Sequence, residues 1–239
     1  MISVRNAEIT VGLITFFIAY IVAVTLAGFV RAWSAKKMGD NTAEYLGLLT
    51  LNPLAHIDIV GVVFLFLFYF GWGRYVPINP FNIRSPLRNI KLFIVYLSDT
   101  LTYFFSALIG IIILVLTAGP RMVDIARHML ICVQHMSHLY LIHTCPTLSS
   151  LAITLSFIVI AFIYLNVILG VLNLILNIFS LGIYFLLNRS SRYDTYNYYL
   201  IILIPIILIF LFSEPLRILA IHGIAIVGYW VALLVGLAR

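Results

Sequence analysis

Long apolar runs constrain this chain more than any other feature of its sequence. Several of them reach about 20 residues, the length that a helix needs to cross the hydrocarbon core of a bilayer. The runs are continuous and do not alternate between apolar and polar residues, which excludes a transmembrane β-barrel. Only 9% of the residues are charged, against about 25% in soluble domains. The sequence therefore predicts an all-α polytopic membrane protein, with a single integral membrane domain over residues 1–239.

The apolar runs predict about six transmembrane helices, over residues 9–30, 59–71 (57–71 with an earlier start), 90–118, 148–187, 199–212 and 216–237. The second run is short for a span, and the fourth is long enough for one span plus a re-entrant or interfacial stretch. Six spans place both termini on one side of the membrane. The loops on that side carry slightly more Lys and Arg, which favours cytoplasmic termini. The first run is too long for a signal peptide, so we interpret it as a true span.

The formal net charge of +6 is distributed over short loops and contains no basic run. This distribution is typical of cations that set the orientation of a membrane protein, and it does not indicate binding to nucleic acid. The two cysteines, Cys132 and Cys145, lie in or beside an apolar region and give no disulfide framework.

Four segments between and beside the first apolar runs carry specific motifs. The first run ends in Ala-Gly-Phe-Val-Arg-Ala-Trp at 27–33, and Gly-Asp-Asn-Thr-Ala follows at 39–43. Leu-Asn-Pro-Leu-Ala-His-Ile-Asp occupies 51–58, and residues 72–80 read Trp-Gly-Arg-Tyr-Val-Pro-Ile-Asn-Pro. These segments resemble the site-2 protease family of intramembrane zinc metalloproteases, over about residues 9–188. The resemblance implies a site-2-protease-like core followed by two further spans, at about 199–212 and 216–237.

The resemblance also implies a zinc site, yet the residues that carry its chemistry are replaced. In the family's H-E-x-x-H motif, two His on one helix face bind zinc and the Glu acts as general base. The corresponding positions here are Ala27, Gly28 and Arg31, none of which can donate a lone pair to a metal. The family's third ligand, an Asp, corresponds to Leu181. The chain retains eight other motif positions: Asn52, Pro53, His56, Asp58, Asn79, Pro80, Asn173 and Gly182.

The segment that carries the family's Asp also lacks the prolines that interrupt the helix there. Residues 172–182 read Leu-Asn-Leu-Ile-Leu-Asn-Ile-Phe-Ser-Leu-Gly. Without proline, the backbone is expected to form a smoother helix. Asn166 and Asn173 are seven residues apart and share one face of it.

Charged residues inside apolar runs are costly and mark functional or paired groups. Asp99 lies within the run 90–118, and we expect it to pair with Arg31 or Arg88, or else to serve an interface. Arg31 is also interpreted as the end of the first span, where its side chain reaches the membrane surface beside Trp33.

Histidines offer a further set of candidates. His56 and His222 are interpreted as hydrogen-bonded structural residues, His222 in the interior of the last span. On one helix His128, Cys132 and His135 would share a face, so a transition-metal site there is chemically feasible. Their spacing matches no zinc signature, and an amphipathic or partly buried connecting segment is the preferred interpretation.

The favoured hypothesis is a catalytically inactive relative of site-2 proteases in a bacterial inner membrane. Such a protein binds a transmembrane segment or a membrane-protein partner without cutting it, and needs no zinc. One alternative is an active metalloprotease with a relocated metal site built from His56, Asp99 and the histidines of 128–143. Another is a polar-cavity binding or transport protein, in which Arg31, Asp99 and the buried asparagines line the cavity. Fold alone does not decide among them, since function lies in the site.

Overall fold

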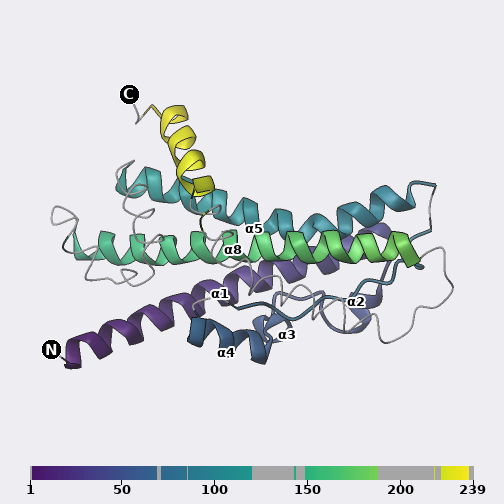
Figure 1. Ribbon diagram of the computed structural model, residues 1–239, viewed down its shortest axis with the longest axis horizontal. Coiled ribbons are helices and arrows are strands. Elements are labelled where there is room, and N and C mark those ends of the chain that lie inside the picture. The colour runs from purple at the N-terminus through teal and green to yellow at the C-terminus, as the bar shows by residue number, and fades with distance from the viewer. Residues whose placement is uncertain are drawn as a thin grey trace.

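Three long helices form the centre of the computed structural model, which describes residues 2–68, 71–84, 86–119, 143, 149–187, 218 and 222–236. They are α1 (Ile2–Met38), α5 (Arg88–Ala118) and α8 (Ser150–Leu187), and each packs against the other two (Figure 1). All three are long and apolar enough to cross a membrane. The all-helical class is confirmed, and the described part of the chain contains three candidate membrane spans.

Helix α1 continues well beyond the expected end of the first span at residue 30. It ends at Met38, where Gly39 adopts a φ of 105° that favours glycine. Arg31 therefore lies inside the helix, and its side chain is 3% exposed. The interpretation of Arg31 as a residue that reaches the membrane surface is wrong, because partners within the protein surround its guanidinium.

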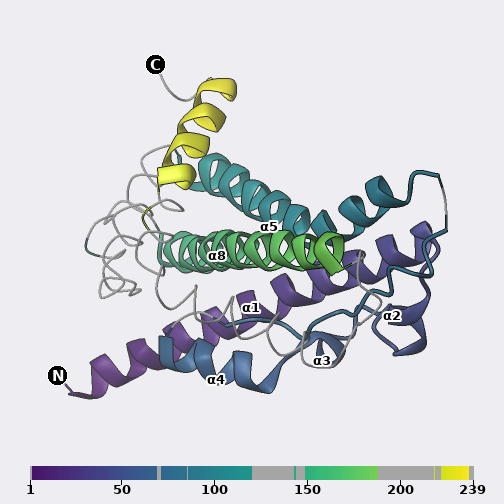
Figure 2. The same cartoon turned by 45° about the vertical axis from the view of Figure 1, so that its right-hand side comes forward.

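The segment expected as the second span, residues 57–71, does not cross the membrane. Its helix α4 (Ile59–Phe68) has ten residues, about 15 Å, half of a typical hydrocarbon core. The chain then returns, so that Ile57 and Gly73 pair as an antiparallel β-bridge (Figure 2). The hydroxyl of Tyr20 on α1 donates to Trp72 O at 2.7 Å and holds the returning chain against the bundle.

A glycine allows this return to pack against α4. A Cβ added at Gly61 would lie 2.0 Å from Trp72 O, so a side chain at this position would clash with backbone. Two short helices precede α4: α2 (Thr42–Tyr45) and α3 (Pro53–His56). Asp58 caps α4, since its Oδ1 accepts a hydrogen bond from Gly61 N at 2.8 Å.

Helix α8 runs without a break for 38 residues, about 57 Å. This confirms the smoother helix expected from the loss of the prolines. It also corrects the expectation of a re-entrant stretch within residues 148–187, because no residue in α8 interrupts the hydrogen-bond ladder.

The last described element is the helix His222–Leu234, which lies within the span expected at 216–237. The span expected at 199–212 lies outside the described residues. His222 Nδ1 is 2.8 Å from Ile218 O, so its hydrogen bond is confirmed. Its expected interior position is wrong, since the side chain of His222 is exposed.

Candidate functional site

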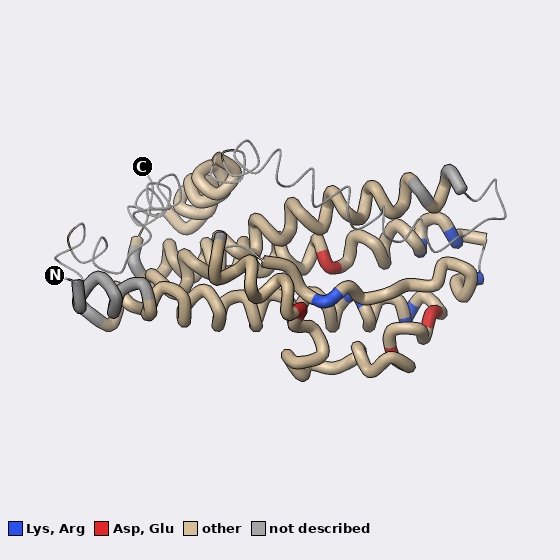
Figure 3. The backbone as a smooth tube through the Cα atoms, turned by 60° about the horizontal axis from the view of Figure 1, so that its bottom comes forward, with Lys and Arg blue, Asp and Glu red and all other residues tan. Residues whose placement is uncertain are grey.

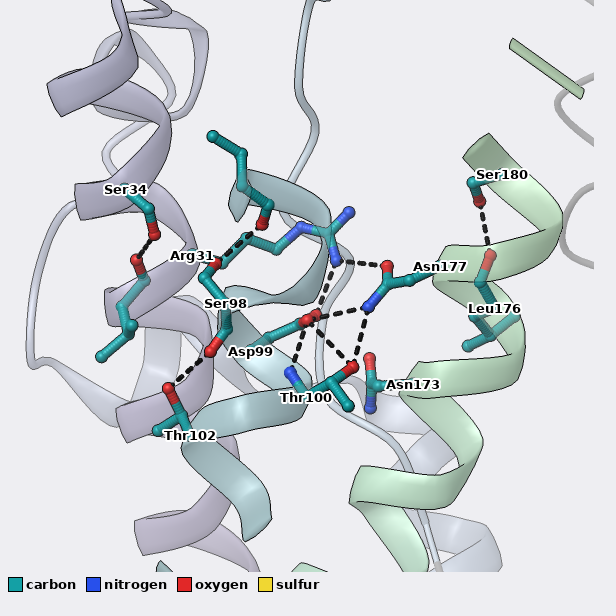
Figure 4. Close-up of polar contacts among 12 residues, drawn as sticks. Arg31, Ser34, Ser98, Asp99, Thr100, Thr102, Asn173, Leu176, Asn177 and Ser180 are labelled. Carbon is teal, nitrogen blue, oxygen red and sulfur yellow. Dashed lines mark hydrogen bonds and ion pairs between the residues drawn. The ribbon is translucent and has the colours of Figure 1, made fainter. Parts of the chain in front are cut away.

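A buried polar cluster joins the three long helices at Arg31. Arg31 Nη1 on α1 donates to Asp99 Oδ2 on α5 at 2.6 Å and to Asn177 Oδ1 on α8 at 2.8 Å (Figure 4). All three side chains are buried. The expected ion pair between Asp99 and Arg31 is confirmed, and Asp99 forms no ion pair with the alternative, Arg88.

The second carboxylate oxygen of Asp99 is also satisfied. Asp99 Oδ1 accepts from Asn177 Nδ2 at 2.8 Å and from Thr100 N at 2.7 Å. Asn177 Nδ2 further donates to Thr100 Oγ1 at 3.0 Å. The amide of Asn177 thus bridges the two charged residues, because its oxygen contacts the cation and its nitrogen contacts the anion. A buried ion pair needs such additional partners to offset its desolvation.

Two aromatic rings cover the guanidinium of Arg31. Its Cζ lies 5.3 Å from the ring centroid of Tyr75 and 5.3 Å from that of Tyr96. The negative faces of the rings stabilise a cation in a region of low dielectric constant. The returning chain after α4, which carries Tyr75, therefore contributes one wall of the site.

One edge of the Arg31 guanidinium has no partner among the described residues. Nε and Nη2 are buried and make no hydrogen bond. These two donors form the edge with which arginine binds paired acceptor oxygens. Buried donors of native proteins are nearly always satisfied, so this edge is where an additional acceptor group fits best.

The positions of the first two catalytic residues of the family are close-packed. Ala27 is 1% exposed and belongs to the main apolar core. Gly28 faces the imidazole of His56, and a Cβ added to it would lie 2.3 Å from His56 Nδ1. His56 therefore occupies the space that a side chain at position 28 would need.

His56 is a hydrogen-bonded, fully buried residue, as the sequence suggested. Its Nε2 lies 2.8 Å from Thr50 O, and because a carbonyl only accepts, Nε2 carries the proton. Burial lowers the pKa of His56 below its usual value, and the charge of Arg74 acts in the same direction. The imidazole is thus held neutral.

Leu181 does not face Arg31. It packs with Tyr96 and Tyr184 in a second, smaller apolar cluster. Asn177, one turn earlier on α8, takes the place beside the polar cluster. The sequence interpretation missed Asn177, although its spacing of four residues from Asn173 and eleven from Asn166 put all three on one helix face.

The other two asparagines of this face bond only within α8. Asn166 Nδ2 donates to Phe162 O and Asn173 Nδ2 donates to Leu169 O, each one turn earlier. Asn166 Oδ1 is buried and makes no hydrogen bond among the described residues. Gly182, the last retained motif position on α8, is exposed.

The retained motif residues of the loops build the turns around the site. Asn52 caps α3 through its side chain, which accepts from Leu54 N at 3.1 Å, and Pro53 is the first residue of that helix. Asn79 N donates to Asp40 Oδ2 at 2.7 Å, and the buried Pro80 follows. Asp40 is fully buried and links the end of α1 to residues 79–82.

The candidate metal ligands His128, Cys132 and His135 lie outside the described residues. Within the described ranges, no three His, Cys, Asp or Glu side chains come close enough to hold a metal ion. The cluster of Arg31, Asp99 and Asn177 offers a fixed cation, a neutralised carboxylate and an amide. This set can bind and orient a hydrogen-bonding group, and it holds no activated nucleophile.

The chain is similar to a protein of Bacillus subtilis (strain 168) described as "Putative zinc metalloprotease YwhC". The two are 34% identical over 99 residues, which cover 41% of this chain and 44% of the relative. The matched region thus spans less than half of the relative's length. This likeness supports a distant relationship. No protein-family model matches the chain, and no solved structure matches it.

Proposed function

We propose that this chain is a catalytically inactive relative of site-2 intramembrane metalloproteases that binds a transmembrane segment without cutting it. The observation that carries the proposal is the buried ion pair of Arg31 and Asp99. At the position where the family has its second zinc-binding His, this chain places a cation that is already bound to a carboxylate.

The residues at the motif positions do not fit zinc. Ala27, Gly28 and Leu181 have no ligand atom, and a guanidinium has only donors. The positive charge of Arg31, held at the centre of the cluster, would repel a divalent cation. No catalytic step through a metal follows from this arrangement.

The packing around Gly28 supports the same conclusion. A general base at position 28 needs a side chain, and the buried imidazole of His56 fills that space. Ala27, one turn before Arg31 on α1, offers no ligand atom and packs in the apolar core.

The donors Nε and Nη2 of Arg31, which make no hydrogen bond, support the binding of a ligand. Because Asp99 neutralises the guanidinium, a neutral acceptor suits Nε and Nη2 better than a second anion does. A backbone carbonyl in a broken part of a transmembrane helix is such an acceptor, since carbonyls freed inside a membrane need new donors. The class of ligand is therefore a transmembrane segment with an interrupted helix.

The absence of catalytic zinc is tested by the metal content of detergent-purified protein. We expect no stoichiometric zinc in the natural chain. A control variant with Ala27→His, Arg31→His and Asn177→Asp is expected to take up zinc, because these changes restore ligand atoms around the cluster. A second control carries Leu181→Asp in place of Asn177→Asp and is expected to bind less. About one zinc per natural chain, the value for a single catalytic site, would contradict the proposal and direct attention to His128, Cys132 and His135.

Binding is tested with two synthetic transmembrane peptides, one a continuous Leu-Ala helix and one with a central Gly-Pro break. A photoreactive residue at Tyr75 reports contact with the site. We expect the broken peptide to cross-link better than the continuous one, and to remain intact. The matched control is the variant Arg31→Met with Asp99→Leu, which removes the donors and the charge together. Equal cross-linking of both proteins, or cleavage of the peptide, would contradict the proposal.

A further inference from the structure

A second arginine lies at the end of the bundle without a counter-ion among the described residues. Arg88 is the first residue of α5, and neither ion pair within the described ranges includes it. Asp99, which the sequence offered as its partner, is bound to Arg31. A partly buried guanidinium without an anion is costly, and the surroundings of Arg88 show which group would neutralise it.

The free donors of Arg88 point to a ligand with paired oxygens. Its Nε and Nη2 are buried and make no hydrogen bond within the described part of the chain. These are the two donors of the side-on edge, which binds two oxygens of a phosphate or carboxylate at once. The guanidinium lies against two rings, with Cζ 5.6 Å from the ring centroid of Tyr184 and 5.5 Å from that of Phe81.

Tyr184 adds a third donor to the same place. The residue is 1% exposed, and its hydroxyl has no hydrogen-bond partner in the described structure. Its ring is the one on which Arg88 lies, so the hydroxyl and the guanidinium belong to one cluster on α8 and α5. Two side chains from different helices thus leave three donors without an acceptor, far more than is usual for buried groups.

The N-terminal end of α5 also carries positive charge, which is unfavourable at the N-terminus of a helix. The N-cap residue, Leu87, has an apolar side chain that makes no cap hydrogen bond, and the first turn contains no acidic residue. Arg88 and Lys91 lie in the first turn, at the positive end of the helix dipole, where anions are favoured and cations are not. A bound anion relieves this repulsion and satisfies the donors together.

The location is that of a membrane surface. The candidate span of α5 begins at Arg88, and that of α8 ends at Gly182, two residues before Tyr184. The coloured Lys and Arg segments lie in the half of the molecule away from both chain ends (Figure 3). Phosphate groups of lipids are found at this depth, next to the ends of transmembrane helices.

We propose that Arg88 and Tyr184 form a binding site for a phosphate group. The side-on edge of Arg88 and the hydroxyl of Tyr184 donate to the phosphate oxygens, and the dipole of α5 adds to the attraction. A phospholipid headgroup and a free phosphate share this chemistry. The site is distinct from the cluster at Arg31, and the proposal does not depend on the proposed function.

The test measures the thermal unfolding of the full chain in maltoside detergent while a ligand is titrated. The probes are phosphatidylglycerol, a phosphate-free diglucosyl diacylglycerol with the same acyl chains, and inorganic phosphate. We expect phosphatidylglycerol to raise the unfolding temperature in a saturable manner, and the glycolipid not to do so. The same saturable rise with inorganic phosphate alone would assign the site to the free ion.

Three variants connect the effect to the site. Arg88→Gln is expected to weaken the apparent affinity at least about tenfold, and Tyr184→Phe about threefold or more, since each removes a donor to a charged group. Tyr184→Phe removes one oxygen that has no described partner, so this variant folds. Arg84→Gln, an exposed cation with the same change of charge, is the control and is expected to keep the natural affinity. Equal stabilisation by both lipids, or equal weakening by Arg84→Gln and Arg88→Gln, would overturn the proposal.

Discussion

Arg31 Nη1 lies 2.6 Å from Asp99 Oδ2, and this contact joins two membrane-spanning helices at side chains that are almost inaccessible to solvent. The two residues are 68 positions apart in the sequence. Because neither charge can reach water or the membrane surface, each depends on the other for neutralisation.

Replacement of one partner alone is expected to destabilise the protein strongly. Asp99→Leu leaves a buried guanidinium without its anion, which costs about 3–5 kcal/mol in the free energy of unfolding. Arg31→Met leaves the carboxylate and is expected to cost a similar amount. The measurement is unfolding by sodium dodecyl sulfate in mixed micelles, followed by circular dichroism.

The double variant Arg31→Met with Asp99→Leu is the control for this prediction. It removes both charges, so its stability is expected to return near that of the natural protein. Additive losses from the two substitutions would show that the ion pair does not couple the two residues.

Asn177 is expected to matter more than its neighbour Asn173. Asn177→Leu removes bonds to both Arg31 and Asp99 and is expected to cost about 1–3 kcal/mol. Asn173→Leu loses one bond to its own helix and is expected to cost less. The same unfolding measurement compares the two variants, and an equal loss would contradict the bridging role of Asn177.

The contact between Gly28 and His56 predicts a clash when a side chain is added. Gly28→Ala places a Cβ 2.3 Å from the buried imidazole and is expected to cost about 1–3 kcal/mol. The loss is expected to shrink in a His56→Ala background, where the space is free. Gly12→Ala is the control: no atom lies within 4 Å of its added Cβ, so it is expected to stabilise α1 by about 0.5–1 kcal/mol. An equal loss from Gly28→Ala in both backgrounds would exclude the contact as its cause.

The lowered pKa of His56 predicts a loss of stability in acid. The unfolded chain binds a proton at an ordinary His pKa of about 6.5, whereas the folded chain resists protonation. The contribution of His56 to the free energy of unfolding is therefore fully present above about pH 7. It is lost as the pH decreases below about 6.5 towards the folded pKa. Stability at pH 8 and pH 5.5 is compared between the natural protein and His56→Gln, whose amide can still donate to Thr50 O. A fall of the same size in both proteins would show that His56 is not responsible.

The return of the chain after α4 changes the expected orientation. Since residues 57–71 do not cross the membrane, the whole connection between α1 and α5 lies on one side. This connection and the adjoining helix ends gather six cations: Lys36, Lys37, Arg74, Arg84, Arg88 and Lys91. The positive-inside rule then predicts that this end is cytoplasmic and that the N-terminus lies on the other side.

Orientation is measured by cysteine labelling in bacterial spheroplasts, after Cys132 and Cys145 are replaced by serine. A membrane-impermeant maleimide is expected to label Ile2→Cys in intact cells and Asn82→Cys only after permeabilisation. The reverse pattern would restore the cytoplasmic N-terminus inferred from six spans.

The sequence by itself determined the membrane class, the approximate positions of the three long helices and the continuity of α8. These properties follow from the length of apolar runs and from the lack of proline, which act locally along the chain. The caps at Asn52 and Asp58, which the structure shows, are also local, because each side chain bonds to a backbone group two or three residues away.

The tertiary structure decided which groups meet. The sequence left Arg31 and Arg88 as possible partners of Asp99. Only the packing of α1 against α5 decides that Arg31 is the partner. Asn177, and not Leu181 one turn further along the same helix face, lies at the cluster, because the position of α8 along its axis is set by its packing against α1 and α5. Hydropathy alone also could not distinguish a short span from a segment that turns back, since the pairing of Ile57 with Gly73 is a long-range contact.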